Sequence, residues 1–248
     1  MSTFSDYFSS SAELYARYRP RYPATLFKRI AHHSPDHQRV WDCGTGSGQA
    51  AVELAMHFDE VIATDPSHAQ LQQAEPEKRV HYGAMTAEHA AIRDASVDTV
   101  TVAQALHWFN RPHFYHEVKR VLVPGGLIAV WSYGLLVIEP AIDARVNAFY
   151  KDEIGAYWPA ERALVETGYA RLEFPFRELA PPIFTMEAAW TLEQFSGFLD
   201  SWSAVTRFRA ANGYSPVERF VETVRPLWGE GTMRRVQWPL EVRAGVTG

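Results

Sequence analysis

Short apolar runs alternate with helical patterns through the first half of the chain. Five runs have the length and composition of strands, at residues 39–43, 61–64, 80–82, 97–103 and 127–131. Helical patterns lie between them at 49–58, 67–74 and 113–122, and Pro124-Gly125-Gly126 stops the last one. Strands separated by helices of this length predict parallel βαβ units, and therefore a doubly wound sheet with helices on both faces.

The pattern changes after Tyr133. A long helical and aromatic stretch is expected over 135–168, a Pro-rich break over 174–182, a strand over 184–190 and a helix over 191–210. Residues 233–242 alternate as a strand does, with Val236, Trp238, Leu240 and Val242 on one face. We therefore expect one domain over 1–248, with an N-terminal lid (about 1–30), a ligand-binding core (about 31–133) and a cap with closing strands (about 134–248).

Composition narrows the class of protein. The 248 residues are 47% hydrophobic, and the formal net charge of −5 includes no basic run, which argues against a nucleic-acid partner. The single cysteine, Cys43, excludes an intramolecular disulfide. The N-terminus lacks a signal-peptide core, and no apolar stretch approaches the roughly 18 residues of a membrane span. A cytoplasmic monomer or homodimer without membrane partners is expected. His113 and His116 have no nearby third ligand, so no metal is expected.

The segment from Val40 to Gly48 carries the strongest local signal. A strand ends at Asp42-Cys43, and Gly44, Gly46 and Gly48 follow at alternate positions before a helix. Residues without Cβ let the backbone turn sharply and let a ligand lie against bare peptide. The spacing differs from the dinucleotide fingerprint G-x-G-x-x-G, and the carboxylate of Asp42 would repel a pyrophosphate. It suits a ligand that carries an ammonium and a sulfonium.

Asp65, followed by Pro66, ends the second strand about one βα unit after the loop. An acidic residue at this place can accept both hydroxyls of a ribose. It could also cap the following helix, although Ser67 is a second candidate for that cap. This position by itself does not separate SAM (S-adenosylmethionine) from NAD.

The pattern D-x-G-x-G-x-G at Asp42–Gly48 resembles the first motif of class I SAM-dependent methyltransferases. Four further segments resemble the branch that includes trans-aconitate methyltransferase-like enzymes: 15–23, 103–109, 124–126 and 236–240. The resemblance covers nearly the whole chain. It implies a Rossmann-like, mostly parallel seven-stranded sheet with a helical cap. It also implies SAM as cofactor and S-adenosylhomocysteine (SAH) as product.

The resemblance also implies roles for single residues. Thr86, Ala87 and Glu88 would hold the adenine, although Thr86 stands where the family often has Asp. Gln104 would touch the methionine moiety. Arg19 would pair with the SAM carboxylate, and Tyr15 and Tyr18 would wall the same pocket.

His107 is the candidate catalytic base, because methyl transfer needs a base only where the acceptor must lose a proton. It could instead make a structural hydrogen bond beside Trp108. Trp108, Trp190 and Trp202 are candidate substrate residues, and we expect a small planar heterocycle or aromatic acceptor, methylated on N or O. The rival acceptor is a small carboxylic acid anchored by Arg207 or Arg209. Two rival classes of protein are an NAD-type oxidoreductase and a non-catalytic SAM-binding protein.

Overall fold

A computed structural model describes residues 18–180 and 182–248 of the chain. Five strands run parallel in the order β3-β2-β1-β4-β5. Their bounds are β1 Arg39–Cys43, β2 Glu60–Thr64, β3 Val80–Gly83, β4 Val97–Ala103 and β5 Leu122–Tyr133. The chain builds outward from β1 to β3 and then returns to place β4 on the other side of β1. The direction of winding therefore reverses between β1 and β4, where ligands bind in open α/β sheets.

Three antiparallel strands close the sheet: β6 Arg177–Leu179, β7 Phe184–Trp190 and β8 Arg234–Val246. Strand β8 pairs with β5 over Leu240–Val246 and with β7 over Arg234–Leu240, while β6 pairs with its last residues. The sheet thus has eight strands where seven were expected. The additional strand is the three-residue β6, which lies inside the Pro-rich segment that the sequence marks only as a break.

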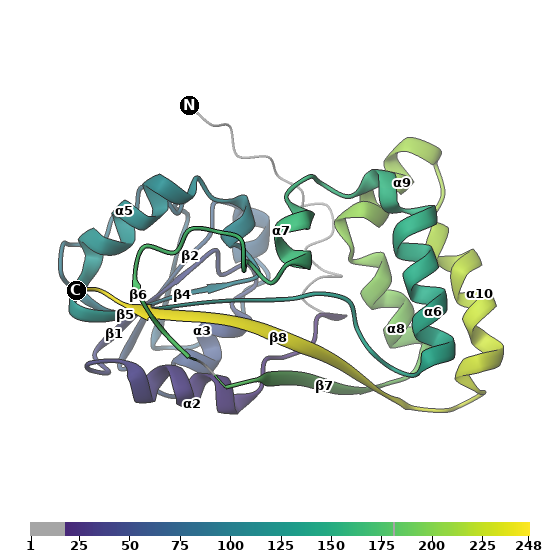
Figure 1. Cartoon of the computed structure of the whole chain (residues 1–248), viewed down its shortest axis with the longest axis horizontal. Coiled ribbons are helices and arrows are strands. Elements are labelled where there is room, and N and C mark those ends of the chain that lie inside the picture. Colours follow the sequence, from purple (N-terminus) through teal and green to yellow (C-terminus); the bar gives the residue numbers. More distant parts are fainter. Residues whose placement is uncertain (1–17, 181) are drawn as a thin grey trace.

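Helices cover both faces of the sheet (Figure 1). Helices α2 (Ala24–His33) and α3 (Gln49–Leu54) pack on one face, and α5 (Arg111–Val121) packs on the other. Because successive strand residues face opposite sides, Val40 belongs to the first core and Trp41, which contacts Phe114, to the second. The N-terminal lid was expected to extend to about residue 30. From Ala24 onward, however, this segment forms α2, which packs on the sheet as part of the core domain. The short α4 (His68–Leu71) follows β2.

A helical cap lies beside the sheet (Figure 1). It consists of α6 (Pro140–Ala148), the short turns η3 (Phe149–Glu153) and η4 (Gly155–Tyr157), α8 (Leu192–Asp200), α9 (Ser203–Asn212) and α10 (Pro216–Trp228). Helix α7 (Arg162–Glu166) lies between sheet and cap, and the single turn η2 (Leu106–Trp108) follows β4.

Two features of the cap differ from the expectation. The helix expected over 191–210 is two helices, because the backbone of Trp202 is extended and makes this residue the N-cap of α9. Helix α10 was not expected, although it buries Val217, Phe220, Val221, Val224 and Trp228 along one face. Among the described residues, no helix is long and apolar enough to span a membrane.

Candidate active site

The glycine loop follows β1 at the point where the winding of the sheet reverses. Gly44 and Gly48 have left-handed backbones, with φ of +73° and +81°. A Cβ on Gly44 would lie 2.6 Å from the Cβ of Ala105, and one on Gly48 would lie 2.3 Å from the Oη of Tyr82. The N–H groups of Gly44 and Thr45 donate to the carbonyl of Thr64 at 2.8 and 2.9 Å. Backbone conformation and close packing both require glycine at these two positions.

Asp42 lies beneath this loop and is fully buried. Its two carboxylate oxygens accept hydrogen bonds from Thr45 Oγ1 at 2.6 Å and from Thr101 Oγ1 at 2.8 Å. Burial raises the pKa of this carboxyl to about 6, against the opposing effect of the two hydroxyl groups. Asp42 therefore fixes the loop to β4, and its charge can act on a ligand only through the loop.

Asp65 directly follows β2 and faces the glycine loop. One carboxylate oxygen accepts from the N–H of Gly46 at 2.9 Å, and the other accepts from the N–H of Ser67 at 2.8 Å. The N-cap of α4 is Ser67, whose hydroxyl accepts from the N–H of Gln70. Asp65 is thus not the helix cap, and Pro66 separates it from Ser67. The carboxylate is half-buried at the carboxyl end of β2, and its role at the ribose stays a prediction.

The segment expected at the adenine lies next to β3. Thr86 is exposed and Ala87 is buried. One oxygen of Glu88 accepts from the N–H of Asn110 at 2.8 Å, which ties this loop to the start of α5. The roles of these three residues at the adenine stay predictions.

Gln104, just beyond the carboxyl end of β4, has a left-handed backbone with φ of +55°. Its N–H donates to the carbonyl of Trp131 at 2.9 Å, and its Nε2 donates to the carbonyl of Tyr133 at 3.0 Å. Its Oε1 is buried and makes no hydrogen bond within the described chain. A strained backbone that positions an unsatisfied acceptor is characteristic of a ligand-binding residue.

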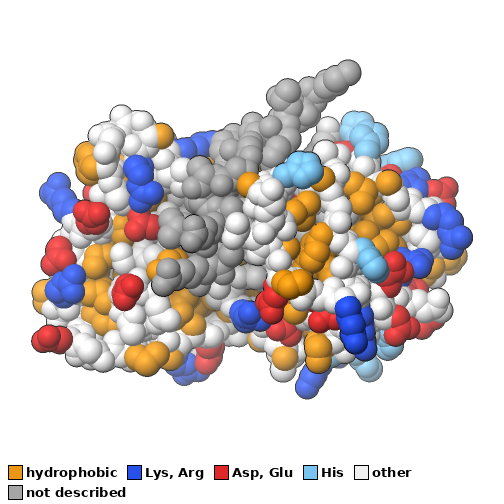
Figure 2. Space-filling view, turned by 180° about the vertical axis from the view of Figure 1, so that it is seen from behind, with side chains coloured by type: hydrophobic (Ala, Val, Ile, Leu, Met, Phe, Trp, Pro, Cys, Tyr) orange, Lys and Arg blue, Asp and Glu red, His pale blue; other side chains and the backbone are white. Residues whose placement is uncertain are grey.

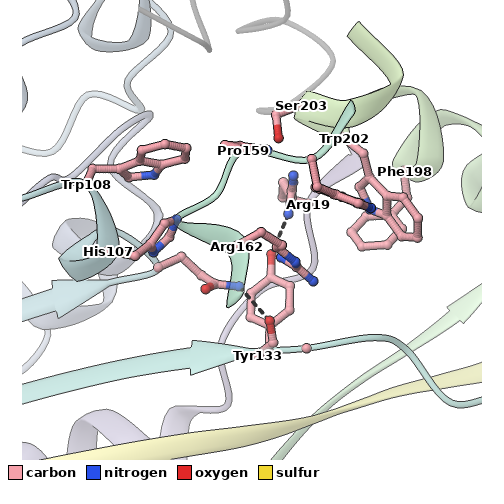
Figure 3. Close-up of a pocket in the computed structure, with 12 residues that line it drawn as sticks. Arg19, His107, Trp108, Tyr133, Pro159, Arg162, Phe198, Trp202 and Ser203 are labelled. Atoms are coloured by element: carbon pink, nitrogen blue, oxygen red, sulfur yellow. Dashed lines mark hydrogen bonds between the residues drawn. The ribbon is translucent and has the colours of Figure 1, made fainter. Parts of the chain in front are cut away.

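A pocket of about 620 Å³, a volume that includes open solvent at its mouth, lies between the strand ends and the cap (Figure 3). It brings together five of the predicted site residues, Arg19, Gln104, His107, Trp108 and Trp202. The other lining residues are Tyr133, Gly134, Trp158, Pro159, Arg162, Phe198 and Ser203. Among the described residues that line it, none is acidic.

Arg19 joins the core to the cap in this pocket. Its guanidinium donates to Tyr133 Oη at 3.0 Å and to the carbonyl of Ser201 at 3.4 Å, and it lies 5.3 Å from the centre of the Phe198 ring. The ring of Tyr18 packs on α8, where a Cβ on Gly197 would lie 2.6 Å from it. Tyr15 lies outside the described residues.

His107 is a buried residue of the turn η2. Its Nδ1 shares a hydrogen bond of 2.8 Å with Tyr169 Oη, and its ring centre lies 4.6 Å from that of Trp108. Burial lowers the pKa of His107 to about 3, and the positive charges of Arg162 and Arg111 add to this effect. At neutral pH the imidazole is therefore uncharged and only weakly basic.

Three residues expected at the substrate are not among those lining the pocket. Trp190 packs inside the cap, with its ring centre 4.8 Å from Trp238 and 5.3 Å from Phe198. Arg209 forms an ion pair with Asp200, and Arg207 donates to the carbonyl of Tyr157 at 3.5 Å. Trp190 therefore packs against Phe198, which lines the pocket, without lining it itself. Neither Arg207 nor Arg209 lines the pocket, so neither is in position to bind an acidic substrate there.

Trp158, one of the aromatic residues of the second half that could wall a pocket for a planar ring, lines the pocket, and so does Arg162, which was not selected as a site residue. The aromatic content near Trp158 was a signal, but nothing local distinguishes Arg162 from other surface arginines. Within 18–180 and 182–248, no group of three or more His, Cys, Asp or Glu side chains could hold a metal ion.

Comparison with known proteins agrees with this geometry. Residues 41–130 match the family described as methyltransferase domain. A candidate methyltransferase of Dictyostelium discoideum is 35% identical over 225 residues, which cover 89% of this chain and 86% of that protein. The solved structure of a candidate type II methyltransferase from Anaeromyxobacter dehalogenans is 41% identical, with a TM-score of 0.85, and the match covers 92% of this chain and 97% of that one.

A phosphoethanolamine N-methyltransferase of Haemonchus contortus, solved with SAH, shares the fold at 15% identity and a TM-score of 0.50. The match covers 100% of this chain and 60% of that one. A glycine loop at the reversal of a doubly wound sheet, with an acidic residue just after the next strand, is the arrangement of a nucleotide-cofactor site, and the matched family and relatives identify the cofactor as SAM. The chain belongs to the methyltransferase family, and it is a SAM-dependent enzyme rather than an NAD-type oxidoreductase.

Proposed function

We propose that this enzyme transfers the methyl group of SAM to a nitrogen or oxygen of a small planar acceptor, either a heterocycle or another aromatic molecule. The pocket carries this proposal, because it joins Gln104 and His107 of the core to the indole rings of Trp158 and Trp202 (Figure 3). Flat aromatic walls suit a flat acceptor, and the polar groups between them can orient it.

The residues around the glycine loop would hold the cofactor, which supplies a methyl group already activated by its sulfonium. Asp65 would accept hydrogen bonds from the ribose, and Thr86, Ala87 and Glu88 would surround the adenine. The Gly44–Gly48 loop would lie under the amino-acid end, with Asp42 below it. Arg19 would bind the carboxylate, with Tyr18 as a wall beside it, and the unsatisfied Oε1 of Gln104 would accept from the ammonium.

Positioning would supply most of the catalysis. The lone pair of the acceptor forms the bond to the methyl carbon, while the carbon–sulfur bond breaks and leaves its electron pair on sulfur. Tyr169 occupies Nδ1 of His107, so Nε2 is the nitrogen available to the acceptor. With a pKa near 3, His107 would orient an acceptor N–H or O–H by accepting its hydrogen bond. The proton that the acceptor atom loses after methylation would pass to water.

Isothermal titration with SAH, with NADH as control, tests cofactor binding in the purified protein. We expect micromolar binding of SAH and none of NADH. Asp65→Ala should lower the affinity for SAH by about 1.5–3 kcal/mol, or roughly 10- to 150-fold, through loss of charge-assisted hydrogen bonds. Asp59→Ala is the matched control, since Asp59 is exposed just before the amino end of the same strand. Equal affinities in the two variants would remove Asp65 from the site.

Turnover separates an enzyme from a protein that only binds SAM. A panel of planar heterocycles and aromatic molecules, followed by small organic acids, is incubated with SAM carrying a labelled methyl group. A labelled product from the first set supports the proposal. A methyl ester formed only from the acids would favour a carboxyl methyltransferase instead.

A further inference from the structure

Two arginine side chains distinguish the pocket. Arg19 and Arg162 both line it, and the described lining residues include no carboxylate. Arg19 is held by Tyr133 and Ser201 and is the residue proposed above for the SAM carboxylate. A second guanidinium in the same pocket calls for a second anionic partner.

Arg162, the first residue of α7, is fixed from one side. Its Nε donates to Tyr150 Oη at 2.8 Å, and the same hydroxyl donates to Glu166 at 2.5 Å. The guanidinium carbon lies 4.8 Å from the centre of the Trp158 ring and 5.5 Å from that of Tyr150. Stacking and the hydrogen bond at Nε preorganise the fork, while the two terminal nitrogens remain available to a ligand.

No carboxylate among residues 18–180 and 182–248 forms an ion pair with Arg162, whereas Arg209, Arg234 and Arg243 each form one. Arg162 is half-buried, so its desolvation is not offset by an ion pair within the described chain. Its charge reaches the pocket interior, because it contributes to the low pKa of His107.

We propose that Arg162 binds a carboxylate on the acceptor, so that the substrate is a planar aromatic or heteroaromatic acid. This inference rests on the proposed function and adds the chemical class of the acceptor. The carboxylate would receive the terminal N–H groups of Arg162, while the ring lies against Trp158 and Trp202. The methyl group goes to a different atom, because a carboxylate paired with a guanidinium has its lone pairs engaged in hydrogen bonds and is a weaker nucleophile.

Binding of matched probe pairs to the SAH-saturated protein tests this inference. The pairs are nicotinate with nicotinamide, and 4-hydroxybenzoate with its methyl ester. We expect each acid to bind at least tenfold more tightly than its neutral counterpart. Arg162→Gln should remove this preference while changing the affinity for SAH less than twofold. Arg162→Lys keeps the positive charge but lacks the planar guanidinium group, so it should retain part of the preference for acids. This variant replaces Arg162→Gln in the test if the glutamine variant does not fold.

Arg207→Gln is the matched control, since it removes a cap arginine that does not line the pocket, and the preference for acids should survive it. A wild-type protein that binds no acid more tightly than its neutral counterpart overturns the inference. So does a tenfold loss of SAH affinity in Arg162→Gln, which would assign Arg162 to the cofactor. If the wild-type protein does not bind SAH, this is seen before any probe is added. That result would contradict the proposed function rather than the role of Arg162.

Discussion

Asp42 is a carboxyl group whose ionisation the fold opposes. Its pKa of about 6 in the folded chain lies above the usual value near 3.9, so the folded state holds its proton more tightly than the unfolded state between these values. The contribution of Asp42 to the free energy of unfolding therefore decreases as the pH rises from about 4 to 6, by on the order of 3 kcal/mol. The chain keeps a carboxyl group at this position although its ionisation lowers the stability of the fold, which indicates that the ionised form of Asp42 has a function.

We expect the affinity for SAH to fall several-fold as the pH is lowered from 7.5 to 5. Asp42 is ionised at the higher pH and neutral at the lower, so its attraction for the ligand ammonium is lost. His107 does not change charge in this range, because its pKa is near 3. Titration calorimetry at both pH values measures the effect. Asp42→Asn should bind weakly and equally at both, and the same pH dependence in this variant would contradict the interpretation.

Gly48 and Gly125 form a matched pair for the close packing of the loop. Both have left-handed backbones, with φ of +81° and +73°, but a Cβ on Gly125 would have no atom within 4 Å. Gly125→Ala should therefore cost only the left-handed strain, about 1–2 kcal/mol. Gly48→Ala adds the contact with Tyr82, and its free energy of unfolding should fall by about 1–3 kcal/mol more. Urea denaturation compares the two, and equal losses would show that the loop relaxes.

Local chemistry made the loop residues predictable. The glycines, Asp42 and Asp65 are recognisable because a strand, a turn and a helix start within a few residues of one another. Arg162 is not, because only the folding of the cap brings it to the strand ends. The exclusion of Trp190 from the pocket lining follows from its packing on Trp238, a partner some fifty positions further along the chain.

At the scale of elements, helix α10 holds the cap together. Trp228 is 1% exposed, and its ring stacks on Phe195 of α8 with ring centres 5.0 Å apart. Its Nε1 also donates to the carbonyl of Thr232 at 3.0 Å. The interior of the cap thus depends on a residue at the end of its last helix.

Trp228→Ala should destabilise the cap by about 3–5 kcal/mol through loss of packing. In hydrogen exchange we expect faster exchange in α8 and α10, while β1, β2 and β4 keep the protection of the unchanged protein. Met233→Ala is the control, since Met233 is 59% exposed. Equal loss of protection in cap and sheet would mean that both unfold as one cooperative unit.

The parallel strands were predicted within a few residues, except β5, which the structure extends at both ends. The failures lie in the second half. The spacing of apolar residues along α10 was a signal that could have been used. No sequence signal marks the break between α8 and α9 or the three-residue β6. Tertiary packing determines the first, and pairing with β8 determines the second.

At the scale of the whole molecule, basic and acidic side chains are interspersed on the face seen in Figure 2. This mixture accompanies the formal net charge of −5. A binding surface for nucleic acid would need clustered positive charge, so we expect a small molecule as the partner.

Binding of the cofactor should stabilise the entire chain. SAH at 100 times its dissociation constant adds about 2.7 kcal/mol to the free energy of unfolding. For a chain of this length, that corresponds to a rise of about 5–10 °C in Tm. Differential scanning calorimetry measures the shift, with NADH at the same concentration as control. A similar rise with NADH would contradict the assignment of the cofactor.

Strand β8 also has a consequence for how the protein is made. It is the partner of β5 on one side, and it carries the two short strands that complete the sheet. A ribosome finishes β5 about 100 residues before it finishes β8, and at about 5–20 residues per second this takes roughly 5–20 s. During that interval the backbone of β5 lacks its final neighbour. An unpaired edge can pair with strands of other chains, so we expect a molecular chaperone that covers exposed β-edges to raise the yield of native enzyme.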